Sequence, residues 1–567
     1  MGFKIGAMAL ACAMPALGAQ SKAGDVGESA SPTIAWFGGL GGHGRKVGAG
    51  SADAQRAFDQ GLAFLFAFNH EEARRSFELA ARLDPTCAMA WWGAAMSYGP
   101  HINNPAMTEA DARSAAEAIA RARASLVPSK SDADRALIEA AVLRYPPEGG
   151  AADRGPCDAA YAAAMKRAWE ANPGDADVGA LLAEALMDLR PWDLWTARRE
   201  PQPGTPEILG LLDRVMEIDA NHPLALHLAI HAHEGSPEPW RAAPAADRLR
   251  FLQPGLAHMV HMPSHIDVRL GRWASAADAN DRAIRADAAY RARRPPEPGF
   301  YRLYMLHNHH MLTYAAMMRG QSDRARKASE GMMAALPIGW ARDHAAIADG
   351  IFALPMEVAM RFGRWDEILA APEPEAAFPL SRALRLAFRG VALAARGKPG
   401  SARREQAAFL EAKKRVPPES RFGNNASADI LAVAEHLLEG EIAYREGDDT
   451  HAFASLRKAV EAEDALRYDE PADWIQPVRH ALGAALSQSG RWAEAEAVYR
   501  EDLERCPENG WSLFGLAECL KARGLAAEEK AVRERFERAW ADADVVLRSS
   551  CFCQPGPGAR AEQDGGN

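Results

Sequence analysis

The feature that most constrains this chain is a spacing that recurs along it, in which a large apolar residue is followed eight positions later by proline. The spacing occurs at Phe77 and Pro85, Met165 and Pro173, Val215 and Pro223, and Tyr499 and Pro507. A second marker is a glycine followed five positions later by alanine, at Gly271, Gly320, Gly447 and Gly490. Small residues let two helices approach, a large residue fills the gap between them, and proline ends a helix because it lacks an amide hydrogen. The two markers therefore predict repeated helix pairs.

Length and composition support an all-helical repeat protein. At 567 residues the chain exceeds a single compact core, so several domains or an elongated array are expected. Hydrophobic residues make up 48% of the chain and charged residues 25%, as in ordinary soluble proteins, and residues that favour strands are scarce. We therefore predict an all-α solenoid of helical hairpins, curved enough to close around a central groove.

From about residue 51 to 545 the sequence resembles the tetratricopeptide-repeat superfamily, most clearly over 55–98 and 478–525. Segments such as FNHEEARRSF, LRPWDLW and HMVHMPSHI are also similar to a histidine-rich subgroup of bacterial repeat proteins, which implies no settled activity. The predicted organisation is a signal peptide at 1–19, an extended Gly/Ser-rich arm at 20–50, N-terminal repeats at 51–220, histidine-rich central repeats at 221–345, C-terminal repeats at 346–545 and a disordered tail at 546–567.

The first residues are typical of an export signal. Lys4 is followed by the apolar stretch 5–17 and by a small-residue cleavage site at Ala19, which predicts a periplasmic or secreted protein. Acylation at Cys12, as in a lipoprotein, is the less favoured alternative. No later stretch reaches the roughly 18–20 apolar residues of a membrane-spanning helix. The net charge of −10 argues against nucleic acid as a partner, since phosphate binding needs a basic surface.

The histidines are concentrated in one part of the chain, because eleven of the 17 lie between His222 and His344. His258, His261 and His265 precede Gly271 by 13, 10 and 6 positions, and His307, His310 and Tyr314 precede Gly320 by the same distances. His227 and Glu234 repeat the interval between His258 and His265. Offsets of three and seven share one face of a helix, so neighbouring repeats are predicted to present polar groups at equivalent places.

These histidines predict a metal centre. In tetratricopeptide repeats this face of the first helix lines the concave groove, so the resemblance implies that the imidazoles point inward. Neighbouring helices pack about 8–10 Å apart, close enough for their imidazoles to share ions bound at about 2 Å. The predicted ligands, sufficient for two metal sites, are His227, His231, His258, His261, His265, His307 and His310. We rank copper narrowly ahead of zinc and iron, because methionines such as Met259 lie among the histidines and suit a soft metal.

Other residues are assigned around this centre. Tyr314 and Glu234 are predicted to manage protons as catalytic residues. Two tryptophans, Trp192 and Trp195, are predicted to cap the groove and stack on an organic substrate. Two arginines, Arg190 and Arg269, are predicted to neutralise an anionic substrate. His101 is predicted to reach into the groove from its N-terminal side.

The remaining motifs narrow the function. A serine nucleophile elbow, a dinucleotide loop, a kinase motif set and a CxxCH haem-attachment motif are all absent from the sequence, so no NAD, flavin or covalent haem is expected. The leading hypothesis is an exported metalloprotein that oxidises a small organic molecule. Two alternatives stay open: a scaffold that binds a peptide or partner protein in the groove, and a metal-dependent hydrolase or metal storage or delivery protein.

Overall fold

The structure, a computed structural model, describes residues 35–126, 131–147, 153–294 and 299–554. The predicted signal peptide and the alternative acylation site at Cys12 lie outside these residues. Among the described residues, strands are confined to β1 (Arg421–Phe422) and β2 (Asn425–Ala426), which pair antiparallel. The predicted all-α class is confirmed.

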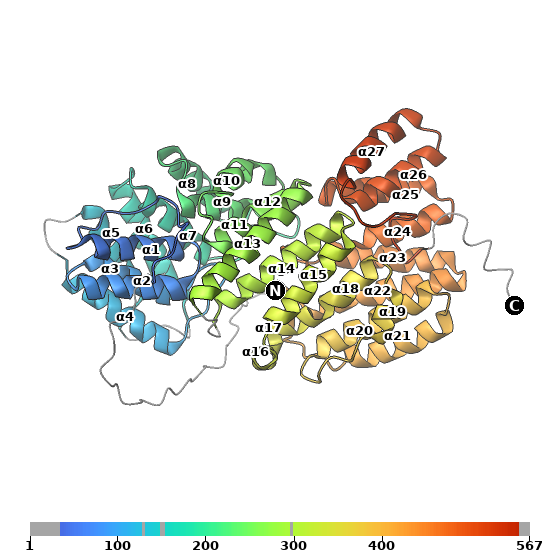
Figure 1. Cartoon of the computed structure of the whole chain (residues 1–567), viewed down its shortest axis with the longest axis horizontal. Coiled ribbons are helices and arrows are strands. Elements are labelled where there is room, and N and C mark those ends of the chain that lie inside the picture. The colour runs from blue at the N-terminus through green and yellow to red at the C-terminus, as the bar shows by residue number, and fades with distance from the viewer. Residues whose placement is uncertain (1–34, 127–130, 148–152, 295–298, 555–567) are drawn as a thin grey trace, which may run out of the picture.

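The helices form one continuous array (Figure 1). The N-terminal part consists of α1 (Ala52–Phe66), α2 (His70–Leu83), α3 (Ala88–Tyr98), α4 (Glu109–Ala124), α5 (Asp132–Arg144), α6 (Gly155–Ala171), α7 (Ala176–Asp188) and α8 (Thr205–Ile218). The central part consists of α9 (Pro223–Glu234), the 3₁₀ helix η1 (Pro239–Ala242), α10 (Ala243–Leu249), α11 (Ala257–His261), α12 (Pro263–Arg269), α13 (Trp273–Arg293), α14 (Tyr301–Met318) and α15 (Ser322–Ala335).

The C-terminal part begins with short helices and continues as hairpins. Its elements before the strands are α16 (Ile338–Asp343), α17 (Ala345–Ala348), the 3₁₀ helix η2 (Asp349–Ala353), α18 (Leu354–Arg361), α19 (Trp365–Ala370), α20 (Pro379–Ala395) and α21 (Pro399–Lys413). After the strands come α22 (Ser427–Glu446), α23 (Asp449–Asp464), α24 (Val478–Gln488), α25 (Trp492–Arg505), α26 (Gly510–Ala522) and α27 (Ala526–Ala539). Helices pack mainly on their neighbours in sequence, as a hairpin solenoid requires. None of the described helices is long and apolar enough to cross a membrane.

The large residues of the recurring spacing fill the gaps between helices, as predicted. Phe77 of α2 is fully buried between Gly61 of α1 and Gly93 of α3, and a Cβ atom on these glycines would lie only 2.7 and 2.4 Å from its ring. Tyr499 of α25 lies in the same way between glycines of α24 and α26. The glycines of the second marker end their helices with φ between 67° and 86°, a conformation that glycine adopts without strain.

The prolines of the spacing follow the predicted pattern in three of four cases. Pro85, Pro173 and Pro507 come just after the ends of α2, α6 and α25. Pro223 instead begins α9, where the missing amide hydrogen is not needed because the first turn of a helix leaves its amides unbonded.

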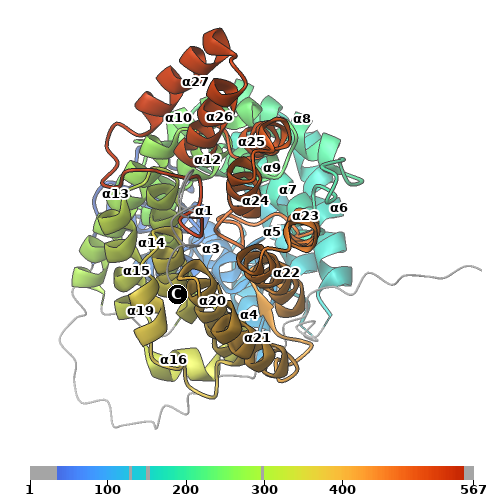
Figure 2. The ribbon, with the colours of Figure 1, turned by 90° about the vertical axis from the view of Figure 1, so that its right-hand side faces the viewer.

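The array curls back so that distant segments meet. Trp273 of α13 donates a hydrogen bond from Nε1 to the carbonyl of Pro507, 2.8 Å away, and Arg467 donates to the carbonyl of Trp192 at 3.3 Å. The view along the array shows its helices arranged around a common axis (Figure 2). The loop between α23 and α24 thereby comes against the insertion between α7 and α8, and these two segments enclose the space described below.

The described parts of the predicted arm and tail pack on the array. In the arm, which has no helix or strand over 35–50, Arg45 forms ion pairs with Asp134, Asp175 and Asp177 at 2.8–3.0 Å. Through these ion pairs the arm ties α5 to α7.

The described part of the predicted tail also packs on the array. Residues 549–554 are mostly buried, and Ser550 donates to the carbonyl of His480 at 2.9 Å.

A glycine substitution tests the helix-packing argument. Gly93→Ala forces a methyl group into the Phe77 ring, so we expect the free energy of unfolding to fall by about 1–3 kcal/mol. Gly210→Ala is the matched control, because Gly210 is exposed on α8 with no atom within 4 Å of the new Cβ. That change should raise the stability by about 0.5–1 kcal/mol. Urea unfolding followed by circular dichroism measures both, and equal effects would contradict the packing argument.

Candidate metal centre

The centre is built on α9, a helix whose residues are all buried. It begins at Pro223, and the side chain of His222 caps its first turn by accepting a main-chain N–H. His227, His231 and Glu234 therefore lie inside the protein, where an unpartnered polar group costs free energy. These three side chains must find partners on neighbouring elements.

Six of the seven predicted metal ligands come together as two triads from α9, α11, α12 and α14. The first triad is His227, His231 and His258, and the second is His261, His265 and His307. Within each triad the candidate ligand atoms lie within 4.8 Å of one another. The close Nε2–Nε2 distances are 3.1 Å for His227 and His258, 2.7 Å for His261 and His265, and 3.4 Å for His265 and His307.

The carboxylate of Glu234 links the two triads on the Nδ1 side of their imidazoles, away from the Nε2 atoms. Its Oε1 accepts a hydrogen bond from Nδ1 of His231 at 2.9 Å, and its Oε2 accepts one from Nδ1 of His265 at 2.5 Å. Burial favours the neutral carboxyl, but the interactions with the two imidazoles outweigh it and hold the pKa of Glu234 at about 2. The ionised carboxylate therefore orients one imidazole of each triad.

The outer hydrogen bonds decide which ring nitrogen of each imidazole carries the proton. Nδ1 of His227 lies 2.9 Å from the carbonyl oxygen of Phe66, and Nδ1 of His261 lies 2.7 Å from Oδ1 of Asn280. The amide of Asn280 is oriented by its own N–H donation to the carbonyl of Ala276 at 2.9 Å. An oxygen of this kind only accepts, so each Nδ1 is the donor, as it is in the two imidazoles bound to the carboxylate. In a neutral imidazole Nε2 is then a bare lone pair.

Four of the six triad imidazoles are neutral near pH 7. Burial, together with the neighbouring imidazoles, lowers the pKa of His227, His258, His261 and His307 well below its usual value. The lone pair on Nε2 of His261 thus faces Nε2 of His265 at 2.7 Å. Such a contact is repulsive unless a proton or a metal ion lies between the two nitrogens, and the ionised Glu234 favours a cation there.

The two histidine helices are offset by one turn relative to their sequence register. The ring of His258 packs on Tyr304 at 4.2 Å and that of His261 packs on His307 at 4.6 Å, whereas the register pairs His258 with His307. Pro263 also divides the first helix into α11 and α12. As a result His310 belongs to no described metal group and its ring contacts Phe422 at 6.2 Å.

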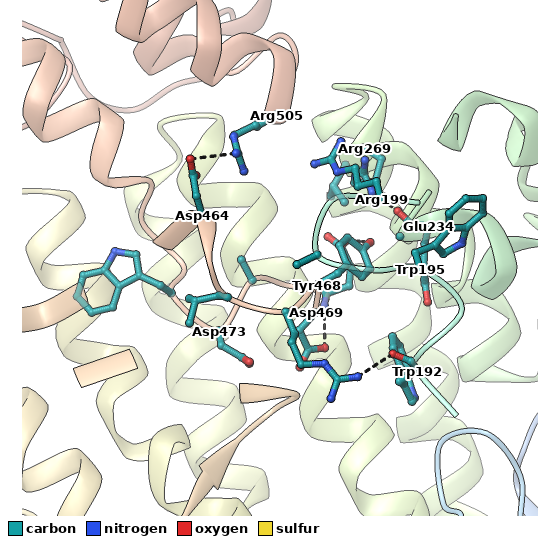
Figure 3. Close-up of a pocket in the computed structure, with 18 of the residues that line it drawn as sticks. Trp192, Trp195, Arg199, Glu234, Arg269, Asp464, Tyr468, Asp469, Asp473 and Arg505 are labelled. Carbon is teal, nitrogen blue, oxygen red and sulfur yellow. Dashed lines mark hydrogen bonds and ion pairs between the residues drawn. The ribbon is translucent and has the colours of Figure 1, made fainter. Parts of the chain in front are cut away.

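A cavity of about 450 Å³ adjoins the first triad at His231, which forms part of its wall together with Glu234. Four predicted substrate contacts, Trp192, Trp195, Arg190 and Arg269, line it, as does Tyr314. Figure 3 shows the tryptophans and Arg269 around this space. Its other wall comes from the loop that includes Tyr468.

The tryptophans are held by their indole N–H groups. Trp192 donates to Oδ1 of Asn103 at 3.1 Å and presents its ring edge to His231, with centroids 5.5 Å apart. Trp195 donates to the carbonyl of Ala232 at 2.8 Å. These bonds fix the orientation of both rings in the cavity wall.

Tyr314 and His101 lie farther from the triads than the sequence suggested. The hydroxyl of Tyr314 is 3.8 Å from Sγ of Cys506, and burial raises the pKa of this tyrosine well above its usual value, so the phenol stays protonated. His101 lies outside the cavity lining and stacks on Phe68 with centroids 4.5 Å apart. Phe68 in turn packs on His227 with ring centroids 4.5 Å apart, so His101 contacts the first triad through the ring of Phe68.

Several contributing residues were missed at the sequence level. Asn280 orients His261 from α13, and no local spacing relates the two residues. Phe68 and Tyr304 pack on the imidazoles as aromatic side chains that look like ordinary core residues in sequence. Phe68 is the first residue of the FNHEEARRSF segment, which was the one available signal.

Comparisons with known proteins do not assign a family. No protein-family model matches the chain, and no curated protein matches it. The human IFIT1 dimer with PPP-AAAA is similar at 13% identity and a TM-score of 0.31, over 85% of this chain and 89% of that one. The APC/C hetero-tetramer Cut9-Hcn1 (13%, TM-score 0.31, 86% of this chain and 76% of that one) and yeast Tom70 (11%, TM-score 0.29, 86% and 90%) are similar as well. At similarities this low, nothing about the site or its function follows from these structures.

The crowding of bare nitrogens has a consequence for stability. In metal-free protein, His307→Leu removes one half-buried imidazole from the crowded triad, and replacing an uncompensated polar group in such a place by an apolar one is close to neutral or stabilising. We expect the free energy of unfolding to stay within about 1 kcal/mol of wild type or to rise.

The matched control is His480→Leu, because His480 is fully buried and its Nε2 pairs with Oδ2 of Asp502 at 2.9 Å. This change removes one hydrogen bond from the buried Asp502 carboxylate, which keeps those from Asn509 and Ser512, and should cost about 1–3 kcal/mol. Urea unfolding in the presence of a chelator compares the two variants. Equal losses would show that the triad imidazoles stabilise the metal-free fold.

Proposed function

We propose that this chain is a metalloprotein in which each histidine triad holds one transition-metal ion, and that the pair of ions oxidises a small organic molecule in the adjoining cavity. The observation that carries the proposal is the tautomer pattern. Four imidazoles use Nδ1 for outer hydrogen bonds and direct bare Nε2 atoms into the triads, which is the state in which an imidazole binds a metal.

The donor set favours copper. Each triad offers only imidazole nitrogens, and both oxygens of Glu234 are occupied by hydrogen bonds. Non-haem iron sites commonly combine two histidines with a carboxylate, whereas imidazole-only sites suit copper and zinc. Of these two metals only copper changes oxidation state, so copper fits an oxidation and zinc would fit a hydrolysis.

The surrounding residues match the needs of such a centre. The carbonyl of Phe66, the amide of Asn280 and the carboxylate of Glu234 orient the imidazoles, and partners of this kind strengthen metal binding. The cavity gives an organic molecule access to the wall formed by His231 and Glu234. Its size lies within the usual range for small-molecule sites, about 300–1,000 Å³.

The proposed reaction is a two-electron oxidation. The substrate loses two electrons and two protons, and dioxygen accepts both, so that one molecule of substrate and one of O₂ give the oxidised product and hydrogen peroxide. Two copper ions that each change by one electron match this stoichiometry. Tyr314 on the cavity wall is the proposed proton carrier, which gives its proton to the reduced oxygen and takes one from the substrate, so that it ends protonated as it began.

Burial of the triads disfavours the alternative of a peptide-binding groove at this place. The exposed fractions of His227, His258 and His261 are 0, 2 and 0%. An imidazole without exposed surface has no contact to offer a peptide or partner protein. The scaffold hypothesis therefore gains no support from the histidines, whatever other surfaces the array presents.

Metal analysis tests the centre itself. Untagged protein reconstituted with Cu²⁺, Zn²⁺ or Fe²⁺ and passed through a desalting column should retain about two equivalents of copper, one per triad. His258→Ala and His307→Ala should each lose about one equivalent. Glu234→Gln should lower the affinity by about 10–100-fold, because the outer partner is weakened.

The control for these variants is His233→Ala, since His233 lies on the same helix, is buried and belongs to no described metal group. It should retain both ions. Absence of any bound metal, or an equal loss in His233→Ala, would contradict the two-triad centre.

Metal substitution tests the reaction class. Copper-loaded protein should consume dioxygen and release hydrogen peroxide with a panel of oxidisable organic compounds, and chelation should abolish the activity. Zinc-loaded protein should bind the same compounds without consuming oxygen, because zinc has no accessible redox change. Activity of the zinc form towards esters or amides, with none of the copper form towards oxidisable compounds, would replace oxidation by hydrolysis.

A further inference from the structure

Three arginines gather at one end of the cavity. Arg199 comes from the insertion before α8, Arg269 from the end of α12 and Arg505 from the end of α25. Arg199 and Arg269 appear together beside Glu234 in Figure 3, and Arg505 lies across the space from them with its guanidinium turned to Asp464. Like charges repel when they are brought together in a partly buried space, so this arrangement is unfavourable without a compensating anion.

The partners of these arginines do not supply that anion. The guanidinium of Arg269 donates to the main-chain carbonyls of Glu234 and Ser236 and lies 5.3 Å from the ring centroid of Tyr468. Within the part of the chain that the structure describes, no carboxylate pairs with Arg199. Burial and the charges of Arg269 and Arg505 lower the pKa of Arg199, which agrees with an uncompensated position.

The nearby acidic groups leave the positive charge in excess. Asp464 is shared between Arg505 at 3.0 Å and Arg479 at 2.7 Å, so one carboxylate serves two guanidinium groups. Burial raises the pKa of both Glu463 and Glu470 to about 8, and each is therefore mainly uncharged at pH 7. The ionised carboxylates of Glu234 and Asp502 also line the cavity. Together with Asp464 they number three, against the four guanidinium groups of Arg199, Arg269, Arg479 and Arg505, so this end of the cavity carries net positive charge at neutral pH.

The charge of a fourth arginine in the cavity wall, Arg190, is compensated by a neighbouring carboxylate. Arg190, predicted from the sequence to meet an anionic substrate, pairs with Asp193 at 2.9 Å. Arg269 therefore remains a candidate contact for an anionic substrate, and Arg199 replaces Arg190 as the second candidate. Arg198, next to Arg199 in the same insertion, is exposed and does not line the cavity.

We propose that Arg199 and Arg269, with Arg505 across the cavity, bind the carboxylate group of the substrate, which makes the substrate a small organic acid. A guanidinium group offers paired N–H donors that match the two oxygens of a carboxylate. The rings of Trp195 and Tyr468 line the space between these arginines and the metal centre, and they suit a flat apolar body. The carboxylate site stands on the cavity alone, whereas its role as a substrate site rests on the proposed function.

Binding to metal-free protein tests the site independently of the metal centre. Benzoate is the probe, benzamide its neutral analogue, and inorganic phosphate a second anion, each titrated calorimetrically into chelator-treated full-length protein. We expect wild type to bind benzoate at least about tenfold more tightly than benzamide or phosphate. Arg199→Gln should weaken benzoate binding by about 10–100-fold, and Arg198→Gln should leave it unchanged.

Each contrary result overturns a distinct claim. Failure of wild type to bind benzoate, or equal binding by Arg199→Gln and wild type, would refute the carboxylate site. Tighter binding of phosphate, with the same dependence on Arg199, would replace the organic acid by a phosphate ester. Specific benzoate binding in a protein that takes up no metal would uphold the site and refute the proposed oxidation. Copper uptake without benzoate binding would uphold the centre and refute the substrate class.

Discussion

The hydrogen bonds from His231 and His265 to the two oxygens of Glu234 are the interaction on which the site depends. They join α9 to α12, link one imidazole of each triad and set the tautomer of both. The carboxylate is buried and ionised, a combination that is expensive unless the charge is compensated nearby. A cation held by the Nε2 atoms in front of the two rings would supply that compensation, so in the proposed centre the outer carboxylate and the inner donor atoms would form one electrostatic unit.

Backbone strain is concentrated around the same region. Among the described residues, the four non-glycine residues with positive φ are Phe68, Trp192, Arg199 and Glu508. Phe68 packs on the first triad, and Trp192 and Arg199 line the cavity. Such conformations cost about 1–3 kcal/mol each and persist where the surrounding contacts enforce them. Three of the four thus hold side chains that face the proposed metal or substrate.

The repeat fold was predictable from the sequence because its determinants are local. Phe77 and the glycines that receive it act within consecutive helices, and the spacing records that contact directly. The histidine triads were predictable in membership but not in pairing. Helix periodicity places His258, His261 and His265 on one face, yet the one-turn offset between α11 and α14 and the break at Pro263 depend on how the helices stack. The cavity wall unites segments far apart in sequence, such as those of Arg199 and Arg505, and no local sequence pattern records that they meet.

The curvature of the array connects these observations. The triads draw on helices of consecutive hairpins, whereas the cavity closes only where the loop before α24 returns to the insertion before α8. Metal binding would therefore stabilise the central hairpins through contacts that are local in sequence, and substrate binding would stabilise the long-range closure. Because any ligand that binds only the folded form adds to its stability, the two ligands act on different parts of the same array. A repeat protein can separate metal loading from substrate capture in this way, since each hairpin contacts mainly its neighbours.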